Sequence, residues 1–557
     1  MNFIRANHRT LFFSGWLLVN LIQAATTELF DDEAYYWLYS QYPAWGYFDH
    51  PPMIAWLIKA GSAIFPGELG VRFFIVLLNT GTVFLIWRLL EKKNDCLFYA
   101  IAASIAVAQI GGIIAVPDIP LLFFVALFFW LYKRYIQQPL FGNGVMLGIV
   151  MALMLYSKYH GVLIVLFTLI SNPGLLRKAS AYIAVLVGIV LFAPHLYWQY
   201  THNFPSVQFH LFERNAVSYR FSFTSEYLLG QIALAGPLIG WLFIWAALKY
   251  KPATLTERAM KFSLIGVYLV FLLSTLKGRV EANWTVPAFV GLMVLSHQWL
   301  NERAGIIRWV YRSVPITLLI VFAGRIYMML DIPVSPLISK DEFHENLRTT
   351  KIIQQLSKNL PVVVIDSYQK PSKQVFYAQQ HAFSLNTPWY RRNNFNYWPI
   401  EDSLIGKSVY AIGSGSEIFK DSIPSVHYKN KKGVRIDNYF SFSKIRINKI
   451  REELVNSSII QFTCNIETPA HYLPLVQKAP YDTASIVITI YNKRGDVLSY
   501  LPTSFKVNNI REEKMQTTIV CNNHGLAAGW YSVRLGISSC LPGYPSLNSS
   551  NFRFEVK

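Results

Sequence analysis

The sequence has little charge and few cysteines for its length. Of its 557 residues, only 15% are charged and four are cysteine. It contains no Walker loop, no Gly-x-Gly-x-x-Gly motif after a predicted strand, no His/Cys array with metal-ligand spacing and no repeat of fixed period. These absences argue against nucleotide chemistry, a clustered metal site and a repeat architecture.

Apolar residues, in contrast, are abundant. They make up 53% of the chain, and its mean hydropathy is +0.29, which is too apolar for a soluble protein of this length. Crossing ~30 Å of hydrocarbon takes roughly 17–25 apolar residues, and such runs recur from Leu11 to about Met328 but not beyond. The sequence therefore predicts a polytopic α-helical membrane protein whose first helix is retained as an anchor.

The positions of Lys and Arg predict the orientation, because short cytoplasmic loops hold an excess of them. The basic clusters are Arg5 and Arg9, Arg88 to Lys93, Lys133 and Arg134, Arg177 and Lys178, Lys249 to Lys261, and Arg303 to Arg312. Placing all of them in the cytoplasm predicts about eleven helices, with the N-terminus inside and the tail outside. The net charge of +19 then reflects these loops and a basic tail, so no nucleic-acid partner is implied.

The pattern predicts three domains. Residues 1–330 form the transmembrane domain. In residues 331–445, PVVVIDSY, SKQVFYAQQH, FSLN and VYAIGSG alternate between strand and helix patterns, which is typical of a small soluble α/β subdomain. In residues 446–557, short alternating runs such as IIQFTCNI, ASIVITIYN, TTIVCNN and GWYSVRLGIS predict an antiparallel β-sandwich.

Three of the four cysteines, Cys464, Cys521 and Cys540, lie in the predicted sandwich, whereas Cys96 is near a cytoplasmic helix end. An outward compartment permits one disulfide among the three and leaves one thiol over. The sequence does not indicate which pair forms.

Three consecutive acids, Asp31, Asp32 and Glu33, follow the first apolar run, and Asp118 lies in the next short outward loop. Acids beside membrane helices usually line a wet cavity, because burying a carboxylate in hydrocarbon is costly. Asp31 suits a helix cap. For Asp32 and Glu33, the aromatic stretch YYWLYSQYPAWGYF predicts an amphipathic helix at the interface that holds both acids at headgroup height.

Cations recur on the same predicted face. They are His50, Arg72, Lys158, Lys277 and Arg279. Transfer of a group from a lipid phosphate needs a base to deprotonate the acceptor and cations to stabilise the departing phosphate. Other interpretations stay open: Lys158 in SKYHG can snorkel to the interface, and Arg72 and Arg279 can pair with acidic neighbours. Glu281 and Trp284 in EANW can dock a sugar or cap a helix.

Six segments in order carry a family resemblance: DDEAYYW, GYFDHPPMIAWL, PGELGVRF, VPDIPLLFF, LYSKYHGVLIV and EANWTVPAF. The chain from about Arg5 to Met328 resembles the bacterial relatives of the protein O-mannosyltransferases, within the glycosyltransferase C (GT-C) fold class, and the lipid A aminoarabinose transferases are similar. The segment RRNNFNYWP, from Arg391 to Pro399, is similar to part of the family's outward tail. The sandwich after Arg446 has no counterpart in the resemblance.

The resemblance implies an enzyme that takes a sugar from a polyprenyl-phosphate donor and passes it, with inversion, to an outward-facing acceptor. Asp32 then matches the general base, Glu33 supports it, and Asp118 orients the acceptor or the base. The family often has an acid followed by Lys before its Pro-Pro pair, whereas this sequence has Asp49 and His50. Because the ordinary pKa of histidine is ~6.5, His50 would be charged only at mild acidity.

Donor binding is therefore expected to rest more on Arg72, Lys158 and Arg279, within a larger set of expected substrate-binding residues. That set is Asp49, His50, Arg72, Lys158, Tyr159, Lys277, Arg279, Glu281 and Trp284. Direct displacement needs neither a nucleotide nor a redox cofactor. A divalent metal is not required, although paired acids facing a phosphate could hold one.

The acceptor is expected to be lipid A or another envelope glycan, with protein Ser/Thr as the alternative, at a bacterial inner membrane with the tail in the periplasm. Two rival functions remain. A secondary transporter is also a helical bundle with intramembrane acids, but the chain lacks repeat symmetry and matched broken helices. A binding or assembly protein would use the sandwich to grip glycans and the bundle as an anchor, for which one helix suffices.

Overall fold

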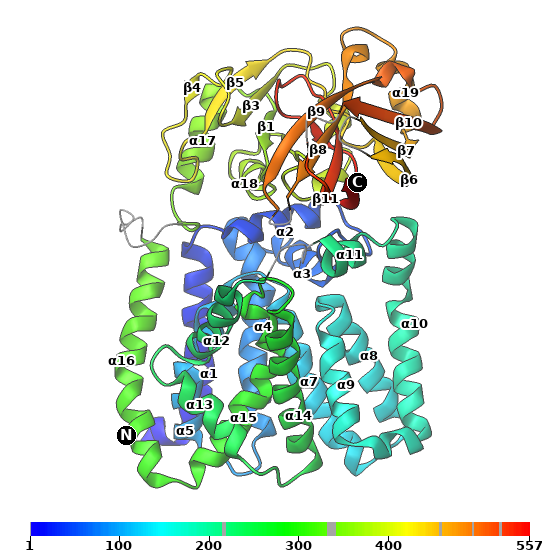
Figure 1. Cartoon of the computed structure of the whole chain (residues 1–557). Coiled ribbons are helices and arrows are strands. Elements are labelled where there is room, and N and C mark those ends of the chain that lie inside the picture. The colour runs from blue at the N-terminus through cyan, green and yellow to red at the C-terminus, as the bar shows by residue number, and fades with distance from the viewer. Residues whose placement is uncertain are drawn as a thin grey trace. The chain divides into compact units, whose positions relative to one another are not determined.

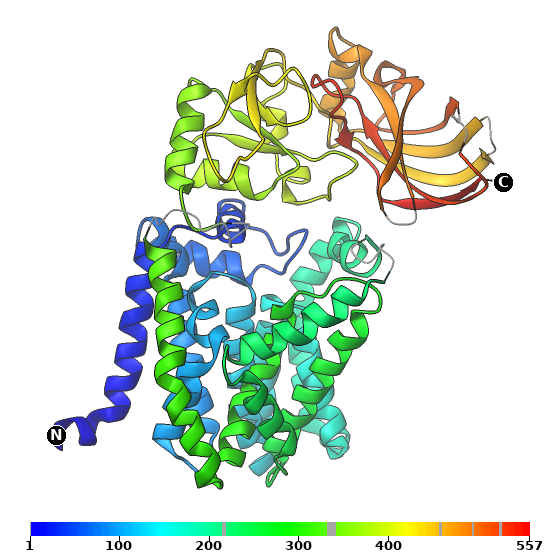
Figure 2. The same cartoon turned by 60° about the vertical axis from the view of Figure 1, so that its left-hand side comes forward.

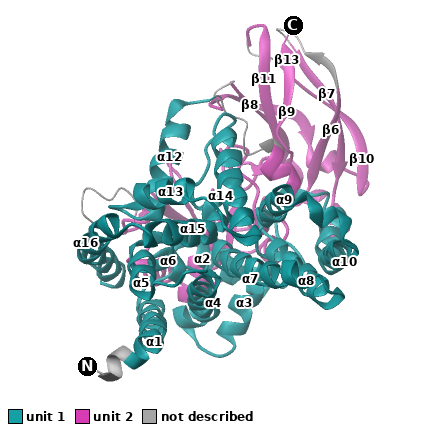
Figure 3. Ribbon diagram, turned by 90° about the horizontal axis from the view of Figure 1, so that it is seen from below, with its two compact units in different colours: residues 1–206, 219–338 teal, residues 207–218, 339–557 magenta. Residues whose placement is uncertain are grey.

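The computed structural model describes residues 2–213, 219–330, 341–455, 459–492, 495–522 and 526–556. The chain divides into two compact units (Figure 3). Unit 1 comprises residues 1–206 and 219–338, and unit 2 comprises residues 207–218 and 339–557. The predicted boundary at 330/331 adjoins residues 331–340, which lie outside the described residues.

Unit 1 is helical (Figure 1). Its first helices are α1 (Asn2–Thr26), α2 (Asp31–Gln41), α3 (Met53–Ser62), α4 (Gly67–Leu89), α5 (Asp95–Ser104), α6 (Ala106–Gln109), α7 (Asp118–Gln137), α8 (Phe141–Ser157) and α9 (Gly161–Ser171). They are followed by α10 (Ala179–Thr201), α11 (Pro205–Gln208), α12 (Phe221–Ala235), α13 (Gly240–Lys249), α14 (Leu255–Ser274), α15 (Phe289–Asn301) and α16 (Ala304–Met329). Two 3-10 turns, η1 (Gly111–Ile113) and η4 (Ala282–Ala288), precede α7 and α15.

Four described helices are long and apolar enough to cross a membrane by themselves: α4, α7, α10 and α16. Three further pairs pass the same test together but bend sharply, by 85° between α1 and α2, 80° between α5 and the segment Ala106–Ile113, and 91° between α12 and α13. The described residues thus contain up to seven spans, besides shorter apolar helices. The chain is a polytopic membrane protein, while the count of eleven helices stays a prediction.

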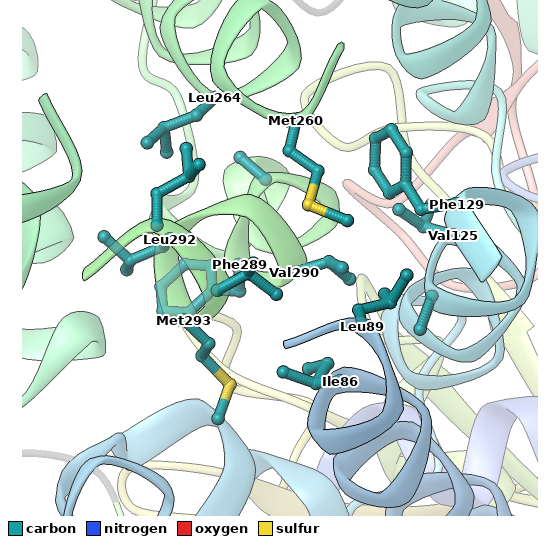
Figure 4. Packing of buried hydrophobic residues seen from close by; sticks show 14 of the residues in the cluster. Ile86, Leu89, Val125, Phe129, Met260, Leu264, Phe289, Val290, Leu292 and Met293 are labelled. Atoms are coloured by element: carbon teal, nitrogen blue, oxygen red, sulfur yellow. The ribbon is translucent and has the colours of Figure 1, made fainter. Parts of the chain in front are cut away.

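The interior of unit 1 is a continuous apolar core where α4, α7, α14 and α15 meet (Figure 4). Ile86, Phe129, Met260, Val290 and Met293 are all at most 3% exposed there. At one side, α1 and α16 run next to each other in both views (Figures 1 and 2). Every residue of α15 from Phe289 to Leu300 is buried, so protein surrounds this helix on every side. A helix in such surroundings is expected to be largely apolar all round.

Glycine lets α8 and α10 approach closely. A Cβ atom added at Gly148 would lie 2.5 Å from the backbone oxygen of Ala184 and 2.7 Å from Cβ of Val187. Small residues at such contacts allow membrane helices to pack through backbone proximity. Gly142, on the same helix, has no atom within 4 Å of the corresponding position.

We expect Gly148→Ala to destabilise unit 1 by ~1–3 kcal/mol, because the added methyl group overpacks a backbone contact that cannot rotate away. Gly142→Ala is the matched control, and it should leave stability unchanged or slightly raised. Thermal unfolding of both variants in detergent measures the difference. Equal unfolding midpoints would show that α8 and α10 can separate without cost.

Unit 2 begins with an α/β layer. Helices α17 (Asn346–Leu356) and α18 (Gln369–Ala378) accompany strands β1 (Val362–Ile365), β2 (Ala382–Leu385), β3 (Val409–Gly413), β4 (Asp421–Ser422) and β5 (Lys432–Ile436). The strand order is β2-β1-β3-β5-β4, in which β1 pairs in parallel with β2 and β3, and β5 is antiparallel to β3. The predicted strand and helix segments fold as β1, α18, β2 and β3, and β1 is buried throughout.

Asp366 follows β1 and is bound to the segment that follows β2. Its carboxylate accepts hydrogen bonds from the backbone N–H of Thr387 at 2.8 Å and from the Thr387 hydroxyl at 2.9 and 3.0 Å. Burial raises the pKa of Asp366 to about 6, against the opposing effects of these hydrogen bonds, of Lys431 and of a hydrogen bond from Trp389. The folded chain therefore keeps this proton at a pH where the unfolded chain has released it.

The stability that this proton contributes is complete below the ordinary pKa of Asp, near 4, and is lost as the pH rises through about 6. We expect lowering the pH from 7 to 5 to raise the unfolding midpoint of unit 2 by roughly 2–4 °C. In Asp366→Asn this part of the pH dependence should disappear. Thermal unfolding of the full chain, followed by tryptophan fluorescence, measures it; identical pH profiles for the two proteins would refute the assignment.

The rest of unit 2 is a β-sandwich (Figure 2). Its strands are β6 (Arg446–Val455), β7 (Ile459–Glu467), β8 (Ser485–Tyr491), β9 (Val497–Lys506), β10 (Lys514–Asn522), β11 (Gly529–Ile537), β12 (Ser546–Leu547) and β13 (Phe552–Val556), with the short helix α19 (Leu473–Val476) between β7 and β8. One sheet has the order β10-β7-β6 and the other β12-β11-β8-β9, with β13 paired to β11. The alternating runs of the sequence thus form an antiparallel sandwich, whose core is shared by both sheets.

The structure does not contain the disulfide that the sequence permits. Cys464, Cys521 and Cys540 are all free thiols. Register explains why the first two stay apart: Cys464 on β7 pairs with Thr517, whereas Cys521 pairs with Ile460. Burial raises the pKa of Cys464 to about 12 and those of Cys521 and Cys540 to about 11. The three thiols are therefore protonated and serve as small apolar side chains.

Candidate active site

Arg72 on α4 is completely buried, and every one of its N–H groups has an acceptor. Nε lies 2.7 Å from Glu33 Oε1, and Nη2 lies 2.5 Å from Glu33 Oε2. The remaining donors reach the backbone oxygens of Ala24, Thr27 and Glu28 at 2.6–3.2 Å. Since a guanidinium has five N–H donors, these five contacts use all of them. Arg72 therefore joins α4 to α2 and the end of α1, and its predicted role in binding donor phosphate does not match this geometry.

Glu33 is equally occupied. Besides Arg72, its carboxylate accepts hydrogen bonds from the backbone N–H of Phe30 at 2.8 Å and of Ala115 at 2.7 Å. The first contact caps the start of α2, and the second joins α2 to the segment that leads into α7. With four donors around it and no exposed surface, Glu33 positions the acidic turn, which is formed by residues 31–33 at the start of α2.

Asp118, the first residue of α7, lies in a second buried polar cluster. Lys158 Nζ is 2.8 Å from Asp118 Oδ1, and Asn283 Nδ2 is 3.0 Å from Asp118 Oδ2. The side chains of Asp118 and Lys158 are 4% and 7% exposed. Lys158 therefore does not snorkel to an interface, because its ammonium group is held inside the protein by a carboxylate.

The two clusters join segments that are far apart in the sequence. The contacts between Glu33 and Arg72, between Glu33 and Ala115, and from Asp118 to Lys158 and Asn283 span 39, 82, 40 and 165 residues. The first cluster reaches Ala115, only three residues before Asp118. Five of the six motif segments thus converge on one end of unit 1, where helices begin and end.

The sixth segment contributes Asp49 and His50, and the base candidate Asp32 lies beside Glu33. Asp32 and His50 are half-buried, and Asp49 is 6% exposed. The His50 ring meets the Tyr36 ring edge-on, with centroids 5.5 Å apart, so the Asp-His-Pro-Pro turn packs against α2. Asp32 therefore lies next to the residue that anchors the start of α2, while its own side chain is partly accessible.

Tyr159 belongs to a neighbouring hydrogen-bonded group. Its hydroxyl lies 2.9 Å from Nε2 of His195 on α10, and Nδ1 of the same histidine lies 2.7 Å from the Trp45 backbone oxygen. Because a carbonyl oxygen only accepts, the His195 Nδ1–H donates to it and Nε2 accepts from Tyr159. This contact fixes the turn between α8 and α9 against the loop after α2.

Four residues that were predicted to contact substrate take no part in the two buried polar clusters. Lys277 and Arg279 are exposed, and Arg279 Nε is 3.6 Å from Glu226 and 4.0 Å from Glu281 in weak, solvent-screened pairs. Glu281 precedes η4 without a side-chain capping hydrogen bond. Trp284 packs on His160 and Phe271, with ring centroids 5.4 and 5.5 Å apart.

Two polar residues in the site had not been predicted. Asn283 lies in EANW between the two residues that the sequence singled out, and only the packing of η4 against α7 shows that its amide is the group that reaches Asp118. His195 lies in an apolar helix, where the available signal was a polar pair one turn apart, His195 and Gln199. Within the described part of the chain, no three His, Cys, Asp or Glu side chains are grouped closely enough to hold a metal ion.

Known proteins of the families that the motifs resemble match part of this chain. Residues 49–198 match the family described as dolichyl-phosphate-mannose-protein mannosyltransferase. The lipid A galacturonosyltransferase RgtD of Rhizobium johnstonii is 24% identical over 303 residues, which cover 52% of this chain and 63% of that protein. The match thus spans less than two thirds of this relative's length.

Crystal structures of ArnT from Cupriavidus metallidurans share the fold. The apo form superposes with a TM-score of 0.58 at 14% sequence identity, covering 77% of this chain and 98% of ArnT. The form bound to undecaprenyl phosphate gives a TM-score of 0.56 with the same identity and coverage. The chain is therefore a polytopic membrane protein with the GT-C fold, as the resemblance implied.

Proposed function

We propose that the protein transfers a sugar from a polyprenyl-phosphate donor to an outward-facing acceptor, with inversion at the anomeric carbon. The observation that carries this proposal is the convergence of the motif segments, through Glu33, Arg72, Asp118, Lys158 and Asn283, on one end of a GT-C bundle. Such a costly arrangement of buried charges is a common sign of a functional site.

In the proposed reaction, Asp32 removes the proton from the acceptor hydroxyl or amine, and the freed electron pair attacks the anomeric carbon. The bond from that carbon to the phosphate oxygen breaks, and polyprenyl phosphate leaves with the bonding electrons. Glu33 and Arg72 hold the acidic turn. Lys158, which is paired with Asp118, is the cation proposed to stabilise the leaving phosphate, and His50 adds a second positive charge when it is protonated.

Lipid A or another envelope glycan is the proposed acceptor, at a bacterial inner membrane with unit 2 in the periplasm. The support comes from two similar proteins: one is named as a lipid A galacturonosyltransferase, and the other was crystallised with undecaprenyl phosphate. Protein Ser/Thr stays the alternative acceptor, because the matching family is described as a protein mannosyltransferase.

The acceptor can be tested with purified chain, labelled undecaprenyl-phosphate sugars and two competing acceptors, lipid A and a Ser/Thr peptide. We expect label on lipid A, with the opposite anomeric configuration to that of the donor. Label on the peptide alone would replace the acceptor but keep the reaction. The donors to be tried carry a hexose, a uronic acid or an aminopentose. If none of them is hydrolysed and neither acceptor is labelled, the proposal is contradicted.

A further inference from the structure

The α/β layer of unit 2 has a topological switch point. From β1 the chain passes to β2 on one side of β1, and it then crosses to β3 on the other side of β1. Strand β1 therefore lies between β2 and β3. In open α/β sheets, ligands bind outside the carboxyl ends of the strands. The segment at this edge after β3 is the small-residue run Ser414-Gly415-Ser416, in which Gly415 has a φ of +81°.

A cavity of about 600 Å³ opens at the end of β3. It is lined by Ser414–Glu417, Phe419, Lys420, Asn430 and Lys432. Backbone pairing fixes its walls, because Lys432 opposes Gly413 of β3 and the Lys420 N–H donates to the Gly433 oxygen at 3.1 Å. The site is thus built by strand ends and not by one loose loop.

The lining carries positive charge that no described residue neutralises through an ion pair. Lys420 and Lys432 are exposed and form no ion pair with any described residue, and neither does Glu417, the one acidic side chain of the lining. The hydroxyl of Ser414 and the amide of Asn430 add polar groups without carboxylates. Two ammonium groups against one carboxylate favour an anionic ligand, and lysine is a common partner of phosphate.

A row of aromatic rings continues from the cavity. Phe419, in the lining, meets Tyr544 with ring centroids 5.7 Å apart; Tyr544 meets Trp389 at 6.5 Å, and Trp389 meets Tyr500 at 6.5 Å. Trp389 and Tyr500 remain 38% and 37% exposed. The Tyr544 hydroxyl donates to the Ser414 backbone oxygen, which joins the row to the cavity rim. Exposed, anchored aromatic faces beside polar groups suit the apolar C–H faces of sugar rings.

We propose that this cavity is a second saccharide site, separate from the transfer chemistry, that binds a phosphorylated sugar. Lys420 and Lys432 contact the phosphate, and the exposed rings of Trp389 and Tyr500 stack on the sugar rings. Binding at this site does not depend on the proposed transfer activity, because every residue involved belongs to unit 2, whereas the motif clusters belong to unit 1.

Calorimetric titration of the full chain in detergent tests the site with three probes: glucosamine 1-phosphate, glucosamine and inorganic phosphate. We expect glucosamine 1-phosphate to bind at least ~10-fold more tightly than either of the others, since each of them lacks one half of the contacts. Equal binding of inorganic phosphate would reduce the site to a simple anion site and overturn the saccharide assignment.

Variants separate the site from general surface charge. Lys420→Gln with Lys432→Gln should weaken glucosamine 1-phosphate binding at least ~10-fold, whereas Lys351→Gln with Lys407→Gln, the same charge change on other exposed lysines of unit 2, should leave it unchanged. Glu417→Gln should tighten binding several-fold, which a misfolded variant cannot do. Equal loss in both double variants, or no gain in Glu417→Gln, would overturn the proposal.

A further comparison identifies the source of the sugar phosphate. A glycolipid carrying the same sugar phosphate, presented in the same detergent, should bind more tightly than the soluble probe if the ligand is a lipid headgroup. Equal affinities indicate a soluble sugar phosphate, and both results support the site. Failure of the glycolipid and the soluble probe alike to bind the wild-type chain contradicts it.

Discussion

Asp32→Asn is expected to lower sugar transfer by ~10²–10⁴-fold, the usual loss when a general base is removed. The amide keeps the size and shape of the side chain but cannot accept the acceptor's proton. The acidic turn should stay in place, because Glu33 fixes it through hydrogen bonds with Arg72 and Ala115 that the substitution leaves intact. The measurement is the rate of label transfer from an undecaprenyl-phosphate sugar, with unfolding midpoints recorded for each protein.

Asp31→Asn is the matched control, because Asp31 is the adjacent, half-buried acid in the same helical turn. It should retain most of the activity, since a first-turn acid contributes mainly a modest interaction with the helix dipole. Normal transfer by Asp32→Asn would show that Asp32 serves only the first turn of α2. Equal losses in both variants would assign the effect to the charge of the turn as a whole.

Arg72→Met is expected to destabilise unit 1 by ~3–5 kcal/mol, because it leaves the Glu33 carboxylate buried without its cation and frees three backbone oxygens. Adding Glu33→Gln should recover part of this loss, since the buried charge is then removed. Thermal unfolding in detergent measures both proteins. The fraction of Arg72→Met that stays folded should have nearly the same KM for donor as the wild type, because Arg72 has no N–H group left to bind a phosphate.

Arg279→Met provides the control for this prediction, since it removes the same side chain from an exposed position with weak ion pairs. Its unfolding midpoint should match that of the wild type. If Arg72→Met unfolds like the wild type and instead raises the KM for donor, the arginine opens toward the phosphate. The donor-binding role predicted from sequence would then be correct.

Composition and periodicity were sufficient to predict the general architecture. A membrane bundle, an α/β layer and a sandwich each have a strong local signal: long apolar runs, strands alternating with helices, and period-two strands with polar turns. The segment PVVVIDSY, for example, contains the apolar run Val362–Ile365, which is buried throughout and folds as β1 between β2 and β3. The number of membrane spans was harder to predict, because hydropathy shows bent helix pairs such as α12 and α13 as one continuous apolar run.

The partners of the site residues depend on tertiary packing that no local pattern encodes. Motif order identified Glu33, Arg72, Asp118 and Lys158, but it did not show that the first two bind each other and the last two bind each other. A sequence also does not reveal that Arg72 meets three backbone oxygens at the bend after α1. For the same reason, Asn283 was overlooked between Glu281 and Trp284, although it is the residue that contacts Asp118.

The central claim is best tested by counting products in sealed proteoliposomes that contain the purified chain and a doubly labelled polyprenyl-phosphate sugar. Sugar transfer predicts one free polyprenyl phosphate for each sugar that becomes attached to acceptor, with both numbers falling together in Asp32→Asn. A transporter predicts that the donor crosses or is bound with its sugar-phosphate bond intact. Intact donor on the far side of the membrane, without free polyprenyl phosphate, would contradict the enzymatic account.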